Sequence, residues 1–381
     1  MLPVRAYQLA GSWAVWAWSV IVVFSFLCAC VFGSLCVRYP GDAGVANAID
    51  AAFGKSIRNM TSLFLIFSVP FGAAAVLLTA SEYLVQITGW NASAAGYGMI
   101  AVCVLILCCR VDFMGGVSFA LSSLCAATLF LGALTSLLFR PLPFVINTPF
   151  EPDRFGHTVL ILLWAVFGWE IIGNYTRDVR DTRKTTTWAV ALSFVVIAAI
   201  DLSVAMAVQW SEGGVPLDGG VSVAGILYSL FGAWSQHVSA FLGVSLCATA
   251  WLLYTGGTSR LIASLSDEGL LPRLLGQRSK AHVPVAATVM LGIVNCAVLF
   301  LAKKGVMDFE GIVGTTNCFM STYALIGAMA AIKTLKSKAI IVAGSLLVVL
   351  FGTVLALYSP RPVLILILAL CAFFSLKRKG K

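Results

Sequence analysis

The sequence predicts an all-α polytopic membrane protein, and two observations carry this prediction. Of the 381 residues, 60% are hydrophobic and only 11% are charged, and the mean hydropathy is +0.96. A soluble domain of this length exposes far more charge. The apolar residues also fall in windows long enough to cross a hydrocarbon core of about 30 Å as helices, and short polar loops separate the windows.

The predicted helices follow these windows in order. Each window is an apolar stretch bounded by charged residues, glycine or proline, and the third and the last are short. We expect membrane spans at 13–37, 62–86, 95–109, 116–139, 157–175, 187–210, 236–256, 284–302, 309–332, 338–357 and 361–376. The intervals leave no room for a soluble domain, so we expect residues 1–381 to form a single transmembrane domain.

The basic residues are distributed unequally between the two sides of the membrane. When the loops are assigned to alternate sides, most of the 25 Lys and Arg residues fall on the side of the C-terminus. Because Lys and Arg accumulate in cytoplasmic loops, this predicts a cytoplasmic C-terminus. The net charge of +9 is spread over short loops and does not predict nucleic-acid binding. The other side receives only Arg5, Arg140, Arg154, Lys303, Lys304 and Arg361.

The residues before the first predicted span are too few for a complete membrane helix. Their helix-like part, residues 2–10, would cover roughly 14 Å at 1.5 Å per residue, which is about half of a bilayer. They carry neither the basic start nor the cleavage site of a signal peptide. We therefore expect residues 1–12 to be the second half of a helix whose first half is absent.

Cysteine and histidine residues give no sign of a metal or catalytic site. The 11 cysteines lie in or at the ends of apolar spans without C-x-x-C spacing, as small packing residues do. His157, His237 and His282 are far apart in the sequence. No nucleophile triad or carboxylate pair occurs at usable spacing. The sequence predicts neither an enzyme nor a resident cofactor or metal.

An acidic residue interrupts the window at 157–175. Gly168 and Gly173 bracket Glu170 in the segment FGWEIIGN. Glycine within a helix costs roughly 1 kcal/mol relative to alanine, and a carboxylate within a membrane costs a few kcal/mol more. A break in the helix would explain both, because it offers free backbone groups to a ligand, and Asn174 would then share a helix face with Glu170. The alternative is a glycine packing notch with Glu170 near the cytoplasmic end, where it reaches water.

Three segments together resemble the amino acid, polyamine and organocation superfamily of transporters. VFGWEIIGNYTRDVRDTRK is similar to the sixth-helix signature of that superfamily. RYPGDAGVANAIDAAFGK resembles its loop after the second helix, and TSRLIASLSDEGLLPRLLGQ, followed by VPVAATVML, resembles its segment leading into the ninth helix. Within the superfamily, the chain is most similar to bacterial exporters of neutral and hydrophobic amino acids, such as methionine and the branched-chain set.

The resemblance implies an inverted five-helix repeat, the leucine-transporter-like fold, with two extra C-terminal helices. Helices one and six would be broken at mid-membrane around the substrate. Residues 1–12 would be the remnant of helix one, 13–139 the rest of the first repeat, 157–332 the second repeat and 338–376 the two C-terminal helices. Most of helix one would be lacking.

The resemblance also implies a substrate site at the break in helix six. Backbone groups there would meet an amino acid, and aromatic side chains would cover it. Phe167 and Trp169 would face the substrate, while Glu170 would tie the broken backbone together. The implied site consists of Trp164, Ala165, Phe167, Gly168, Trp169 and Glu170.

Three residues are candidates for coupling transport to Na+ or H+. Ser245 and Thr249 lie at i and i+4 on the predicted eighth helix of the family, whose hydroxyls help to bind the ion in sodium-coupled relatives; packing is the alternative. The lysine that many superfamily members carry on helix five has no counterpart in 116–139. Asp201 lies near the middle of 187–210, where it would relay protons or make a structural hydrogen bond.

The resemblance therefore implies a secondary carrier of small neutral or hydrophobic L-amino acids in the bacterial inner membrane. It would export or exchange its substrate by alternating access. The alternative is a truncated, non-transporting membrane protein of the same fold, such as a remnant, a sensor or a subunit.

Overall fold

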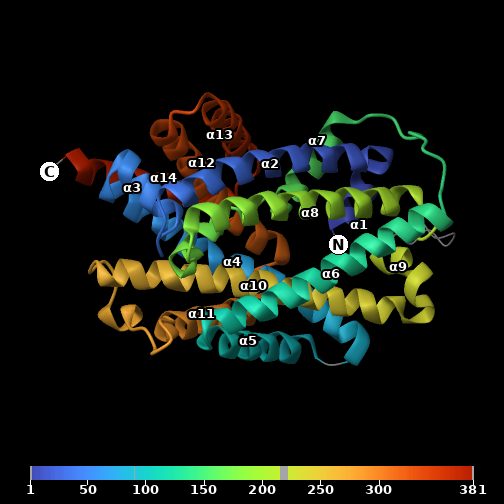
Figure 1. Cartoon of the computed structure of the whole chain (residues 1–381), viewed down its shortest axis with the longest axis horizontal. Coiled ribbons are helices and arrows are strands. Elements are labelled where there is room, and N and C mark those ends of the chain that lie inside the picture. The colour runs from blue at the N-terminus through green and yellow to red at the C-terminus, as the bar shows by residue number, and fades with distance from the viewer. Residues whose placement is uncertain (1, 90, 215–221, 380–381) are drawn as a thin grey trace.

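The apolar windows of the sequence form helices that run side by side along the longest axis of the molecule (Figure 1). The structure is a computed structural model and describes residues 2–89, 91–214 and 222–379. Within these ranges, eight helices are long and apolar enough to cross a membrane. Ala92–Cys108 and Arg361–Phe374 are shorter apolar helices. The prediction of an all-α polytopic protein is confirmed.

Most helices lie over the predicted spans, but several are longer: the helix Lys55–Thr88 begins before the predicted 62–86, and the helix Ser235–Asp267 continues beyond the predicted 236–256. In chain order they are α1 (Leu2–Ala10), α2 (Ala14–Arg38), α3 (Val45–Phe53), α4 (Lys55–Thr88), α5 (Ala92–Cys108), α6 (Val111–Phe139), α7 (Pro152–Leu162), α8 (Thr182–Trp210), α9 (Val223–Phe231), α10 (Ser235–Asp267), α11 (Val285–Lys303), α12 (Phe309–Leu335), α13 (Lys338–Tyr358) and α14 (Arg361–Lys379). Short 3-10 helices are η1 (Gly11–Trp13), η2 (Leu163–Ala165), η3 (Ile171–Asp178), η4 (Gly232–Trp234) and η5 (Arg273–Gly276). Helices α3 and α9 are not predicted by hydropathy, because nine residues cannot span a membrane.

The two ends of the bundle differ in their charged residues. Helices α2, α5, α10, α12 and α14 all end on the side of the C-terminus, which lies at the left in Figure 1. We call this side the basic end, because Arg38, Lys55, Arg260 and Lys333 lie there. Helix α1 lies in the half of the bundle away from it (Figure 1).

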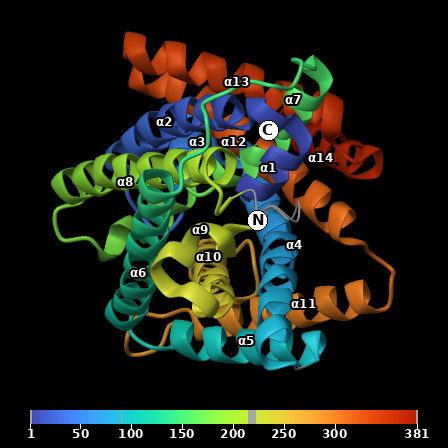
Figure 2. The same cartoon turned by 90° about the vertical axis from the view of Figure 1, so that its right-hand side faces the viewer.

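Helix α4 lies at the centre of the bundle, where it packs against both α10 and α12. Helix α2 packs against α8, and α12 packs against α13. The view along the bundle shows α13 at one edge and α5 and α11 at the opposite edge (Figure 2). Trp251 of α10, Tyr323 of α12 and Phe64 of α4 are among the largest fully buried side chains, while Phe119 of α6 and Trp188 of α8 are exposed and would contact lipid.

The predicted span 157–175 is not one continuous helix. Helix α7 passes through η2 into a turn at residues 166–170, and η3 continues beyond the turn. Helix α1 packs against α7, so the short N-terminal helix lies beside the first part of the interrupted segment. This interruption positions the candidate site described below.

Candidate functional site

The candidate site is the turn at residues 166–170, which we call the break. Outside the helices, backbone hydrogen bonds here join Val166 N–H to Leu163 O (2.9 Å) and Ile171 N–H to Gly168 O (3.3 Å). Gly168 has φ +134°, a value that L side chains rarely adopt. The peptide groups of the break therefore leave the regular helical ladder, which at membrane depth is tolerated where backbone is buried in protein or lines a cavity.

Glu170 folds back onto the break. It is 1% exposed, and both of its carboxylate oxygens accept from the Gly168 N–H at 3.1 Å. The Tyr254 hydroxyl of α10 donates to Glu170 Oε1 at 3.5 Å. A buried carboxylate without partners would be costly, so these donors explain how the chain tolerates an acid at this depth.

The aromatic side chains of the break, and Trp164 just before it, pack against neighbouring helices. Trp169 is 6% exposed and donates its Nε1–H to Ser25 Oγ of α2 at 3.0 Å. Phe167 stacks on Phe351 of α13, with ring centroids 6.0 Å apart and an interplanar angle of 16°. Trp164 packs against an apolar cluster whose buried members include residues of α4, α5 and α10. The rings predicted to cover a substrate are thus engaged with neighbouring helices in this conformation.

Several buried hydroxyls on α10 and α12 have no hydrogen-bond partner among the described residues. Tyr323 of α12 is fully buried and interacts electrostatically with Glu170, and its hydroxyl has no hydrogen-bond partner among the described residues. On α10, the hydroxyls of Thr255 and Thr258, one and four residues after Tyr254, are also buried and have no hydrogen-bond partner among the described residues. An unpaired buried polar group costs about 1–3 kcal/mol. Such a group in a native protein calls for an explanation, and a ligand or a water molecule that supplies the partner is one.

Ala165 is the smallest side chain of the predicted site. It is the last residue of η2 and packs, partly buried, against the central apolar cluster. It contributes no polar side-chain group to the break.

On the basic side of the break, η3 fits closely against two other elements. A Cβ added to Gly173 would lie 2.8 Å from Gly44 Cα, in the loop between α2 and α3. A Cβ added to Gly256 of α10 would lie 2.6 Å from the Tyr175 hydroxyl. Such close approach needs glycine. The loop, η3 and α10 therefore close this side of the break.

Asn174 joins the same three elements by hydrogen bonds. It is fully buried, and its Nδ2 donates to Asp42 O at 3.0 Å and to Gly257 O at 3.2 Å. The prediction that it shares a helix face with Glu170 is wrong. Because η3 is a 3-10 helix with three residues per turn, positions four apart do not align.

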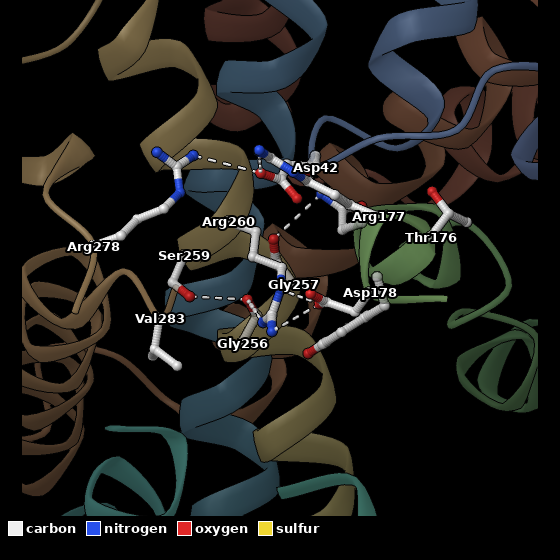
Figure 3. Close-up of polar contacts among 12 residues, drawn as sticks. Asp42, Thr176, Arg177, Asp178, Gly256, Gly257, Ser259, Arg260, Arg278 and Val283 are labelled. Carbon is white, nitrogen blue, oxygen red and sulfur yellow. Dashed lines mark hydrogen bonds and ion pairs between the residues drawn. The ribbon is translucent and has the colours of Figure 1, made fainter. Parts of the chain in front are cut away.

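One group of ion pairs centres on Asp42, as Figure 3 shows. Its Oδ2 lies 2.9 Å from Arg177 Nη1 and 3.4 Å from Arg278 Nη2. Arg278 also pairs with Asp267 at 2.7 Å. Asp42 thus links the loop after α2 to η3 and to the loop after α10.

A second group centres on Arg260 of α10, also drawn in Figure 3. Its Nη2 lies 3.2 Å from Asp178 Oδ2, and its Nη1 donates to Gly256 O at 3.1 Å. The guanidinium lies 4.5 Å from the centre of the Tyr175 ring. This stacked geometry suits arginine better than lysine.

Arg58 and Glu268 pair at the basic end. The Arg58 side chain is 4% exposed and the Glu268 side chain 35% exposed. Both amino groups of Arg58 bind the carboxylate, with an Nη2–Oε1 distance of 2.6 Å. The hydrogen bonds from Arg58 lower the pKa of Glu268 below its usual value.

The structure does not bring Ser245 and Thr249 to the break. Ser245 is buried against Cys125 of α6, and Thr249 Oγ1 donates to Ser245 O at 2.9 Å. The side chain of α10 that reaches Glu170 is instead Tyr254.

Asp201 lies partly buried on α8. One turn further along, Val204 packs with residues of α6 and α9, and Ala205 packs in the central apolar cluster. Among the residues that the structure describes, no hydrogen bond or ion pair is found for its carboxylate.

Several residues around the break are not predicted by the sequence. Tyr254 and Tyr323 are single hydroxyls within long apolar spans, and only their position in such spans could have drawn attention to them. Asp42 and Arg260 lie in segments that carry the family resemblance, but neither segment indicates a partner.

The model of the protein family described as "Amino acid permease" matches residues 6–376. The L-methionine/branched-chain amino acid exporter YjeH of Escherichia coli (strain K12) is 22% identical over 312 residues, which make up 78% of this chain and 72% of that protein. The putrescine transporter PotE of the same strain is also 22% identical over 312 residues, covering 77% of this chain and 70% of that protein.

Crystal structures of a manganese transporter from Eremococcus coleocola have a similar fold. One variant gives a TM-score of 0.59 at 12% identity, covering 100% of this chain and 88% of that chain. The same transporter with an aromatic bis-isothiourea substituted compound gives 0.58, with the same identity and coverage. At this identity the similarity shows the fold alone, and it agrees with the fold class predicted from the sequence.

Proposed function

Because the chain belongs to the amino acid permease family, we propose that it carries small neutral or hydrophobic L-amino acids across the bacterial inner membrane. Family membership and the two relatives support the coarser statement, transport of amino acids or polyamines by a multi-pass membrane protein. The neutral substrate, and export or exchange by alternating access, are our proposal.

The hydrogen bonds of Glu170 favour a neutral substrate, because they leave this carboxylate less free to bind a cation. Its carboxylate already accepts from Gly168 N–H and from Tyr254. A diamine carries two positive charges and needs acidic partners, whereas the ends of an amino acid match the backbone N–H and C=O groups that a broken helix presents. The surrounding Trp164 and Phe167 rings suit an apolar side chain.

A movement of η3 would open its contact with the loop at Gly44 and with α10, which closes the basic side of the break. We propose that η3 separates from the loop at Gly44 and from α10, so that the substrate leaves toward the basic end. The basic end would face the cytoplasm, in agreement with the distribution of Lys and Arg.

Asp201 is the group we propose for proton coupling. Its carboxylate lies within a membrane-crossing helix and has no partner among the described residues, whereas the hydroxyl of Thr249 is bonded to its own helix. Asp201→Asn should therefore reduce transport driven by a pH gradient and flatten its pH dependence. Unchanged uptake and unchanged pH dependence would rule out the relay.

The main test is exchange in proteoliposomes. The full chain, reconstituted in liposomes loaded with unlabelled L-leucine or L-methionine, should accumulate the labelled amino acid from outside. Gly168→Ala should abolish exchange, because φ +134° is strained for alanine. Gly98→Ala, where no atom lies within 4 Å of the added Cβ, is the matched control and should exchange normally.

Three outcomes would contradict the proposal. Exchange of putrescine but not of amino acids would point to a polyamine carrier. No exchange of either would favour a non-transporting protein of this fold. Normal exchange by Gly168→Ala would remove the break from the mechanism.

A further inference from the structure

A group of lysines gathers at one corner of the basic end. Lys55 begins α4, Lys333 lies in the last turn of α12, and Lys336 and Lys338 flank the link between α12 and α13. All four are exposed. We call these four residues the lysine patch.

Hydrogen bonds hold this corner together. Lys333 Nζ donates to Ala52 O, near the end of α3, at 2.6 Å. Ser56 Oγ, next to Lys55, donates to Phe374 O of α14 at 3.1 Å. In Figure 1, α3 and α14 accordingly lie together near the C-terminus. The last turn of α14 adds further basic residues to the sequence here: Lys377, Arg378 and Lys379.

The protein itself does not neutralise the lysine patch. In the described part of the chain, none of its four residues forms an ion pair. Glu268, whose pKa is lowered mainly by Arg58 and also by Lys55, is bound by Arg58. The patch therefore presents a net positive charge to its surroundings.

Lys336 has a backbone conformation that is unusual for lysine. Lys336 caps the end of α12 in the left-handed conformation, with φ 51° and ψ 15°. Glycine or asparagine usually fills this position, because other side chains adopt it at a cost. The chain keeps a lysine where the local backbone favours glycine, which is consistent with a use for its charge.

The lysine patch borders the surface that faces the membrane. From this corner, exposed apolar side chains extend along α4 and α14 toward the opposite end of the bundle: Phe373, Leu368, Leu366 and Ile365 on α14, and Phe67 on α4. We propose that the lysine patch binds the headgroup of an anionic phospholipid whose acyl chains lie along α4 and α14. A phospholipid satisfies both the cationic corner and the apolar strip, whereas a free phosphate would use only the lysines.

A lipid titration of the purified full chain tests this proposal. In an uncharged detergent, phosphatidylglycerol should raise the melting temperature, and phosphatidylcholine should not. Each lysine near an anionic lipid contributes about fivefold in affinity, or ~1 kcal/mol. The triple variant K55Q/K336Q/K338Q should therefore need on the order of 100-fold more phosphatidylglycerol for the same shift.

The matched control removes three exposed cations from the opposite end. The variant K303Q/K304Q/R361Q should respond to phosphatidylglycerol like the unmodified protein, and without lipid all three proteins should melt at the same temperature. The proposal fails if K55Q/K336Q/K338Q keeps the full response, or if the control loses as much. It also fails if inorganic phosphate at the same concentration reproduces the shift. None of these results depends on which substrate is carried.

Discussion

The role of Glu170 is set by two short-range contacts and one long-range contact. Gly168, two residues away, supplies the N–H that both carboxylate oxygens accept, and Tyr254 approaches from 84 residues further along the chain. The glycines flanking Glu170 already indicate a weak point in the helix, so the local half of this arrangement could be predicted. The tyrosine could not, because nothing in its own neighbourhood distinguishes it from a packing residue.

Replacing Glu170 should separate the effect of its hydrogen bond to Gly168 from the effect of its charge. Glu170→Ala leaves the partly buried Gly168 N–H without an acceptor and should destabilise the protein by about 1–3 kcal/mol. Glu170→Gln keeps an acceptor and should cost less. Thermal denaturation in detergent measures both variants, and equal losses would show that the hydrogen bond to Gly168 contributes little.

The pair of Arg58 and Glu268 makes stability depend on pH. Arg58 lowers the pKa of Glu268 in the folded protein, so the pair stabilises the fold above the unfolded pKa of about 4.3. This contribution is lost as the pH falls through the lower, folded pKa. Glu268→Gln should lower the melting temperature at pH 7, and the difference from the unmodified protein should shrink below about pH 4. A difference that stays constant down to pH 3 would contradict this.

At the scale of elements, η3 is the segment that closes the basic side of the break. It is a short 3-10 helix held by the loop after α2 on one side and by α10 on the other, through Gly173, Asn174 and Tyr175. An apolar window predicts where a span lies, but it does not predict whether every part of that span is an α-helix or a 3-10 helix. The 3-10 geometry arises from contacts with segments more than 80 residues away, which is why the predicted alignment of Asn174 with Glu170 fails.

Adding one methyl group should loosen this contact. Gly173→Ala places a Cβ 2.8 Å from Gly44 Cα and 3.1 Å from Cys36 Sγ. Overpacking of about 1–3 kcal/mol should raise the open population roughly tenfold. Buried Cys36 should then react faster with a membrane-permeant maleimide, as mass spectrometry of proteolytic peptides would show. Gly98→Ala is the control, and equal reaction rates would show that η3 does not gate the break.

At the scale of the whole molecule, an apolar belt lies between two ends of different charge. The belt is visible in the exposed apolar side chains of α6, α8 and α13, and the basic end collects most of the Lys and Arg residues. The hydropathy of a segment and the charge of a loop depend on their own residues and not on which residues they contact in the fold. The sequence alone therefore predicts the spans and a preferred orientation.

Cysteine labelling can test the orientation. Cys109 is exposed and follows α5 at the basic end. A membrane-impermeant maleimide should label it in inside-out vesicles but not in intact cells, and Cys109→Ser should lose this label. A cysteine introduced by Lys303→Cys, at the opposite end, should show the reverse. Labelling of Cys109 in intact cells would place the basic end outside.

The sequence by itself determined the membrane spans, the weak point at Gly168 and Glu170, and the resemblance to a transporter superfamily. Each of these depends on residues close together in the chain, through hydropathy, backbone preference or a continuous motif. Only the tertiary structure decided that Trp169 meets Ser25, that Glu170 meets Tyr254, and that Ser245 faces α6 instead of the break. These partners come from different helices, and the direction in which a helix presents each side chain is fixed by how the helices pack against one another.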